Sequence, residues 1–122
     1  MNTSCRAFVD ALIQHSAEMQ VVYRETLDYW SPDEPPLTTL FAALGDQIVL
    51  DFDRVKNEVN RAIFRQIESA MVSGDEQLIT AVATGLIESI VAKASLEMEL
   101  WQQVLPMFGE QSHKHVVAWI GT

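Results

Sequence analysis

Residues 63–91, IFRQIESAMVSGDEQLITAVATGLIESIV, place a short polar turn between two apolar stripes, and this arrangement decides the fold. On both sides of the turn, apolar residues recur three and four positions apart, which is the spacing of one buried helical face. The turn, SGDE at residues 73–76, combines a glycine that can end a helix with a Ser-x-x-Glu capping box that can begin the next. The first stripe extends back to Ile48. We therefore predict a long helix from Ile48 to about Val72, followed by an antiparallel helix that includes residues 78–91.

The N-terminal third of the chain predicts two further helices. An apolar stripe runs from Phe8 to Trp30 and predicts one long helix that ends before Ser31-Pro32. Prolines make residues 31–37 a connector, because they prevent a helix from growing there. A shorter helix is expected to begin at Thr38 or Thr39 and to reach Gly45, which either ends it or marks a kink.

The C-terminal third predicts shorter helices. Ser95 is expected to cap a helix that Pro106 shortens or kinks, and Ser112 is expected to cap one or two last turns. The final apolar residues are predicted to return to the core; they are Val116, Val117, Trp119 and Ile120. We see no strand pattern longer than four residues. The prediction is a single all-α domain over residues 1–122, an antiparallel helical bundle of about five helices.

Composition limits the functions that the chain can have. Its 122 residues include 17 acidic and 8 basic side chains, which gives a formal charge of -9 and an isoelectric point near 4.6, the wrong sign for gripping a phosphate backbone. The single cysteine, Cys5, cannot form an internal disulfide, and no stretch approaches the roughly 18 uninterrupted apolar residues of a membrane span. Asp10 interrupts the apolar core that a signal peptide would need. We expect a cytoplasmic protein that binds neither nucleic acid nor membranes.

The sequence contains no pattern typical of a catalytic site. Glycine-rich phosphate loops, the Gly-x-Ser-x-Gly pattern and the His-Glu-x-x-His pattern are all missing. Glu110 and His113 have the i, i+3 spacing of helical metal sites, but such sites need two copies of the motif and only one exists. His15 is expected to hydrogen-bond across the bundle, and Cys5 to be buried and idle. We expect no enzyme, no metal and no cofactor. The three tryptophans are expected to close the core; they are Trp30, Trp101 and Trp119.

The order of charged residues along the chain is more informative. From Glu25 to Asp53 there are seven acidic residues and no Lys or Arg. Half of the basic residues then follow within twelve positions; they are Arg54, Lys56, Arg61 and Arg65. The three arginines would form one basic ridge on a continuous helix. Glu58 and Glu68 would partly neutralise this ridge. The acidic stretch is either a solvated surface that maintains solubility or a docking face for a basic partner.

Several core and turn motifs resemble those of a known family. In chain order they are Tyr29-Trp30, Pro35-Pro36, Leu40-Phe41 with Gly45, Ile63-Phe64-x-x-Ile67-Glu68, Ser73-Gly74-Asp75-Glu76, Thr84-Gly85-Leu86-Ile87-Glu88, Phe108-Gly109, Ser112 and Trp119. This order is similar to that of a family of small all-helical bacterial proteins. Many of its members resemble immunity proteins of polymorphic-toxin systems, the partners of toxins delivered by contact-dependent or type VI secretion. The resemblance implies a protein that binds one cognate toxin and blocks its active site or holds it inactive.

We therefore predict an immunity protein that neutralises a cognate, basic toxin domain through an acidic surface. The expected contact residues are Asp46, Asp51, Asp53 and Glu58, with a second group in the loops that consists of Asp33, Glu34, Asp75 and Glu76. The alternative is a homodimeric secretion chaperone or regulatory adaptor, because 48% of the residues are hydrophobic and only 20% are charged. A third hypothesis is an enzyme or metal protein built on His15 or on Glu110 and His113.

Overall fold

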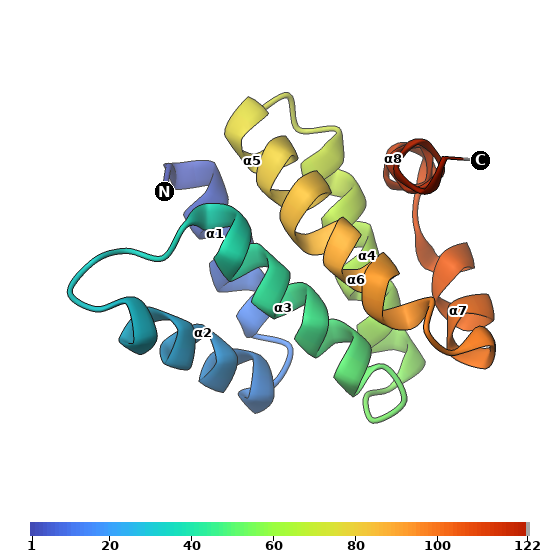
Figure 1. The fold of residues 1–122 in the computed structure, drawn as a ribbon, viewed down its shortest axis with the longest axis horizontal. Coiled ribbons are helices and arrows are strands. Elements are labelled where there is room, and N and C mark those ends of the chain that lie inside the picture. The colour runs from blue at the N-terminus through green and yellow to red at the C-terminus, as the bar shows by residue number, and fades with distance from the viewer. Residues whose placement is uncertain (122) are drawn as a thin grey trace.

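The computed structural model describes residues 1–121, and this part of the chain is all-α, as predicted, without a strand (Figure 1). The elements are α1 (Thr3–Ile13), α2 (Ala17–Trp30), α3 (Leu37–Asp51), α4 (Asn57–Met71), α5 (Glu76–Thr80), η1 (Ala81–Ile87), α6 (Glu88–Ala94), α7 (Met98–Val104), η2 (Leu105–Met107) and α8 (Glu110–Ile120). The segments α5, η1 and α6 form one continuous central helix, and η2 is a 3-10 turn at the end of α7. Residues 1–121 therefore contain seven helices rather than the predicted five.

The predicted first helix is in fact two helices. α1 ends at Ile13, and the Ser16 hydroxyl accepts a hydrogen bond from the Met19 backbone N–H at 3.1 Å, which caps α2. The apolar stripe continues across the break because both helices bury residues in the same core. Spacing alone therefore did not distinguish one helix from two.

The predicted helix from Ile48 to Val72 is also wrong. α3 runs through Gly45 to Asp51, and a turn separates it from α4. The Asn60 side-chain amide holds this turn by donating to the Phe52 carbonyl at 2.9 Å. Phe52 is itself buried, and the Val55 backbone N–H still donates to the Asp51 carbonyl at 3.1 Å, so the turn keeps the apolar spacing and part of the hydrogen bonding of a helix.

The centre of the fold is a close, parallel pair formed by α3 and the central helix, which lie side by side in Figure 1. Two glycines permit the close approach. A Cβ atom on Gly45 would lie 2.7 Å from the Leu86 carbonyl oxygen, and one on Gly85 would lie 2.8 Å from Cβ of Phe41. Gly85 belongs to η1, a π-helical segment of seven residues. α4 connects the two parallel helices by running in the opposite direction.

The central helix, Glu76–Ala94, is long and apolar enough to cross a membrane by length and composition, with a mean hydropathy of 1.3 over its most apolar window. In this fold, 56% of that window is buried inside the protein. Leu86, Ile87 and Ile90 are each 0% exposed. Its apolar character is that of a core helix.

The C-terminal elements differ from the prediction in their limits. Ser95 ends α6 instead of capping the next helix, which begins after Glu97, and α8 is a complete helix of 11 residues. Val116 reaches the core, as predicted, but Trp119 and Ile120 are each 45% exposed. The buried face of α8 ends at Val116, one turn before these residues. The other two tryptophans, Trp30 and Trp101, are half-buried.

Candidate functional site

The eight acidic residues predicted as contacts do not form one surface. Asp33 and Glu34 lie in the connector before α3, and Asp53 and Glu58 lie in or after the turn that follows it. The 15-residue α3 separates these groups by about 22 Å. Figure 1 shows the connector and the turn after α3 at opposite ends of that helix.

Asp51 is not a surface residue, which corrects the prediction. Its side chain is 6% exposed, and Oδ1 accepts a hydrogen bond from the Gln47 amide at 2.9 Å. Oδ2 of Asp51 and Oδ1 of Asn60 are buried without a hydrogen-bond partner in the described residues, and both side chains line the same small cavity. His15 also lines it, and its Nε2 lies 3.2 Å from the Gln66 side-chain oxygen, so this histidine is bonded across the bundle as expected.

Asp46 joins two helices. The Ser89 hydroxyl on α6 lies within hydrogen-bond distance of the Asp46 carboxylate and of the Ala42 carbonyl oxygen, both on α3. Asp46 is half-buried, and this contact occupies one of its oxygens. Within the first predicted group, the fully exposed carboxylates are those of Asp53 and Glu58.

Asp75 also has a structural role. Its carboxylate caps α5 by accepting a hydrogen bond from the Leu78 backbone N–H at 2.9 Å, and it accepts another from the Asn2 side chain at 3.2 Å. These bonds, that of Leu78 foremost, lower the pKa of Asp75. The predicted capping box with Ser73 as the cap is therefore replaced by an Asp75 cap, preceded by Gly74 at a φ of +81°. Glu76 is exposed.

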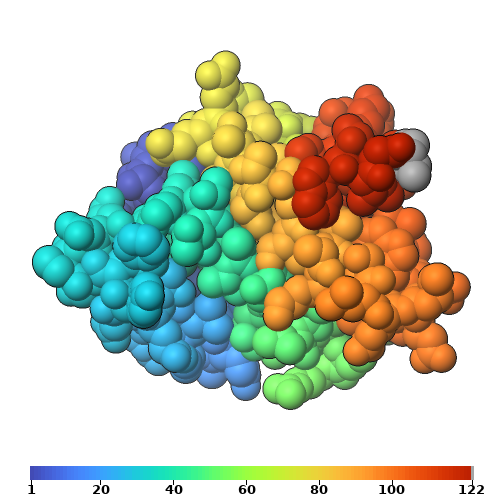
Figure 2. Space-filling model, in the orientation of Figure 1, coloured from blue at the N-terminus to red at the C-terminus, as the bar shows by residue number. Residues whose placement is uncertain are grey.

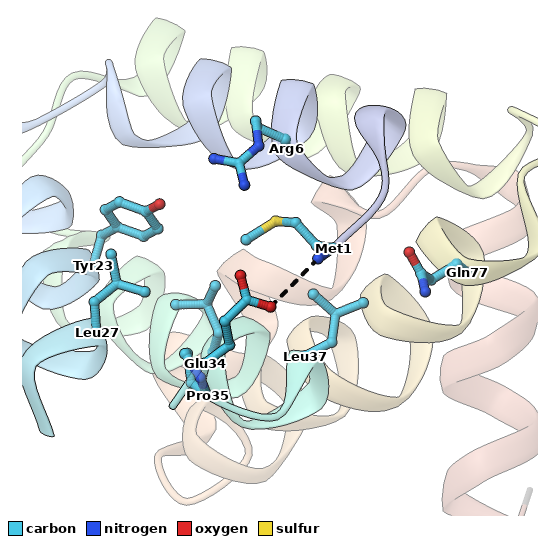
Figure 3. Close-up of a pocket in the computed structure, with 9 residues that line it drawn as sticks. Met1, Arg6, Tyr23, Leu27, Glu34, Pro35, Leu37 and Gln77 are labelled. Atoms are coloured by element: carbon cyan, nitrogen blue, oxygen red, sulfur yellow. Dashed lines mark ion pairs between the residues drawn. The ribbon is translucent and has the colours of Figure 1, made fainter. Parts of the chain in front are cut away.

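The connector covers a hollow of about 400 Å³ between α1, α2 and α3. In Figure 3, Arg6 descends from α1 on one side of this hollow, and Glu34 rises from the connector on the other. The terminal ammonium of Met1 lies between them, 3.9 Å from the Glu34 carboxylate. Leu27 and Leu37 provide apolar walls. The hollow thus has room for a partner's side chain, with charges of both signs at its edge.

α2 beside this hollow is the least buried of the long helices. Only one of its 14 residues, Met19, is buried, and Tyr29 is 83% exposed. Exposed carboxylates precede and follow this tyrosine in the chain, and we define the acidic connector face as Glu25, Asp28, Tyr29, Asp33 and Glu34. Figure 2 shows the connector and the end of α2 as a protrusion at one edge of the molecule. The uninterrupted acidic stretch was the sequence signal for this face, although Glu25, Asp28 and Tyr29 were not among the predicted contacts.

The acidic charge of the molecule is almost entirely uncompensated by basic side chains. Across residues 1–121, the single ion pair between a lysine or arginine and a carboxylate joins Lys114 to Glu110 at 3.7 Å. Both of these side chains are exposed, as is His113. No group of three potential metal ligands occurs in the described part of the chain. The carboxylates of the acidic connector face therefore have no Lys or Arg partner.

The predicted basic ridge does not form. Arg54 lies in the turn before α4, so only Arg61 and Arg65 share a helix. Glu68, expected to pair with these arginines, instead accepts hydrogen bonds from the first residues of α8. Cys5 is 0% exposed, and burial raises the pKa of its thiol, which disfavours a nucleophilic role.

Comparison with protein-family models, with curated proteins and with solved structures found no match for this chain. The family resemblance of its turn and core motifs stays a prediction. The exposed charges and side chains described above therefore carry the functional proposal.

Proposed function

We propose that this protein is an immunity protein that binds and neutralises a cognate bacterial toxin domain, and that the acidic connector face docks on a basic surface of that toxin. The observation that carries the proposal is a group of exposed carboxylates without Lys or Arg partners, close in the chain to a tyrosine that is 83% exposed. The motif resemblance to immunity proteins supports the same function.

The chemistry of the face suits a protein partner. Uncompensated negative charge accelerates association with a basic surface through long-range attraction. Tyrosine is enriched among the residues that contribute most to protein interfaces, because it buries a large area at a small entropic cost. Pro32, Pro35 and Pro36 restrict the connector, so fewer conformations are lost when it binds. A basic toxin site that acts on nucleotides or nucleic acids would fit this face, as would other basic toxin sites.

Co-expression tests the proposal. An immunity gene lies directly downstream of its toxin, so the product of the adjacent upstream gene is expressed with and without this chain, and growth and co-purification are followed. Rescue together with a stable complex is expected. Toxicity without rescue, or no toxicity at all, contradicts the immunity function.

A matched pair of charge reversals tests the docking face. Asp33→Lys with Glu34→Lys is expected to slow association with the toxin by at least about tenfold while leaving the melting temperature nearly unchanged. Asp53→Lys with Glu58→Lys makes the same change of charge at the other end of α3 and is expected to have a much smaller effect. If Asp53→Lys with Glu58→Lys slows association more than Asp33→Lys with Glu34→Lys, the docking face lies at the turn after α3. If neither double variant changes the association rate, an acidic docking surface is excluded.

The alternative of a homodimeric chaperone or adaptor is favoured by a different observation. Large apolar side chains are exposed outside the acidic connector face, among them Leu96 (83%), Met98 (70%) and Trp119 (45%). Light scattering distinguishes the two functions, because a strict monomer across the concentration range argues against the homodimer.

A further inference from the structure

A shallow groove separates α4 from the end of α7 and η2. It consists of two adjoining hollows of about 310 Å³ each, which share Arg61, Pro106 and Met107. Phe64 lies under one hollow and Phe52 under the other, both buried, and the apolar side chains accessible in the groove are Pro106 and Met107. The groove is far from the acidic connector face in the chain, and no residue of that face lines it.

Two unpaired arginines border this groove. Arg61 and Arg65 are exposed and lie one turn apart on α4, and like charges at this spacing destabilise a helix. Neither guanidinium has a carboxylate within 4.0 Å among residues 1–121, although the chain has 17 acidic residues. The carboxylate that lines the groove, Glu68, directs both oxygens to the backbone of α8. Most basic side chains of the described residues have no carboxylate partner, but Arg61 and Arg65 are the two that line this groove, so the groove presents positive charge that an anionic ligand would complement.

The dimensions of the groove indicate the kind of ligand. The two arginines are separated by about 6 Å along α4, and side chains two residues apart in an extended peptide are separated by about 6.6 Å. From Asn57 to Glu68 the groove follows α4 for about 16 Å, the length of roughly five extended residues. Gln102 supplies an amide that can bond a peptide backbone, whereas the Gln103 amide already donates to the Glu99 carbonyl. A single small anion would occupy only part of this length.

We propose that this groove binds an extended peptide segment of a protein partner, with two carboxylates two residues apart that contact Arg61 and Arg65. Guanidinium groups bind carboxylates through paired, charge-assisted hydrogen bonds, and an apolar residue of the peptide contacts Pro106 or Met107. The overall charge of -9 repels such a peptide at long range, but at physiological ionic strength this repulsion is screened beyond about 8 Å. The site is independent of the immunity function, because it has the opposite charge and uses other residues.

Titration of the isotopically labelled protein with a capped peptide, Gly-Glu-Leu-Glu-Gly, tests the proposal by nuclear magnetic resonance. Shifts are expected at the side-chain N–H groups of Arg61 and Arg65 and at backbone amides of residues 102–109. Arg61→Gln and Arg65→Gln are each expected to weaken binding at least about tenfold, because each removes a charge-assisted contact. Arg54→Gln is the matched control, since Arg54 is exposed outside the groove, and it is expected to leave the affinity unchanged.

Three results would overturn the proposal. The first is an absence of shifts at millimolar peptide, and the second is equal binding of the peptide in which both Glu are replaced by Gln. The third is inorganic phosphate producing the same shifts at the same concentration, which would identify a simple anion site. Because both arginines are exposed, the variants are expected to keep the native melting temperature, and reversing both with Arg61→Glu and Arg65→Glu should transfer the preference to a Gly-Lys-Leu-Lys-Gly peptide.

Discussion

Glu68 shows how one side chain on α4 sets the start of another helix. Its carboxylate accepts hydrogen bonds from the backbone N–H groups of Gln111 and Ser112, both at 2.9 Å, and from the Ser112 hydroxyl at 2.8 Å. Burial raises the pKa of Glu68, but these hydrogen bonds outweigh burial and hold it below the ordinary value of 4.5. A lowered pKa in the folded state means that the stabilisation is complete above the unfolded pKa and is lost as the pH falls through the folded one.

We predict that Glu68→Gln lowers the free energy of unfolding by about 1–2 kcal/mol at pH 7, because α8 loses its charged cap. Glu25→Gln, an exposed change in the middle of α2, is the control and is expected to cost less than about 0.5 kcal/mol. Urea denaturation at several pH values measures both. The difference between the wild type and Glu68→Gln should shrink as the pH falls below about 4.5. A difference that is the same at pH 3 would contradict a role for the ionised carboxylate.

Cys5 is predicted to react slowly with thiol reagents in the native protein. Its side chain is 0% exposed and burial raises the pKa of the thiol, so both access and the thiolate fraction are reduced. At pH 8 we expect labelling at least about a hundredfold slower than in urea, which corresponds to local opening by roughly 2.7 kcal/mol. Thr84→Cys in a Cys5→Ser background provides an exposed reference thiol. Equal rates for the two thiols would show that the beginning of α1 is not packed as described.

At the scale of elements, helices were predictable from the sequence but several of their limits were not. The prediction of helix on both sides of residues 73–76 is confirmed, because a helix end and a capping residue are local features. The breaks after Ile13 and Asp51 were missed. After Asp51, the buried Phe52 keeps the helical spacing, and the bond from the Asn60 amide to the Phe52 carbonyl that holds the turn comes from the next helix. After Ile13, none of residues 14–16 is buried, and the break is marked by the local cap from Ser16 to the Met19 N–H, which lies within the predicted stripe.

The close contact between α3 and η1 leads to a prediction for Gly45→Ala. The added Cβ would lie 2.7 Å from the Leu86 carbonyl oxygen, so the two helices must separate. We expect a loss of about 1–3 kcal/mol in the free energy of unfolding, despite the roughly 1 kcal/mol by which alanine favours a helix over glycine. Thr84→Ala, an exposed change on η1, is the control and should be nearly neutral. Thermal denaturation measures the stability of both variants. A Gly45→Ala variant more stable than the wild type would show that α3 and η1 are not held this closely.

At the scale of the whole molecule, we predict unequal protection from hydrogen exchange. The central helix contributes more buried residues than any other helix, whereas α2 buries only Met19. Amides of residues 81–94 are therefore expected to exchange slowest, through global unfolding, and those of α2 to exchange faster through local opening. Mass spectrometry of peptide fragments measures both. Equal protection of α2 and the central helix would contradict the peripheral position of α2, whereas protection of α2 only in the presence of a partner would agree with the acidic connector face.

The eight acidic residues predicted as contacts differ in their surroundings. Asp33, Glu34, Asp53, Glu58 and Glu76 are exposed. Three other predicted contacts have structural surroundings; they are Asp46, Asp51 and Asp75. Sequence could not separate these two sets for three reasons. Ser89 reaches Asp46 from a distant part of the chain, and the burial of Asp51 depends on tertiary packing. The bond from the Leu78 N–H to Asp75 depends on where α5 begins.

The helical class and the turn at residues 73–76 follow from the sequence, because helix spacing and helix ends depend on residues close together in the chain. The excess of acidic charge follows from composition alone. Only the tertiary structure decided that α3 and the central helix pack in parallel at Gly45 and Gly85. It also decided which charges are free: Glu68 is occupied by α8, whereas Arg61 and Arg65 are left without a carboxylate. These features depend on contacts between residues distant in sequence, and local spacing does not specify which helical faces meet.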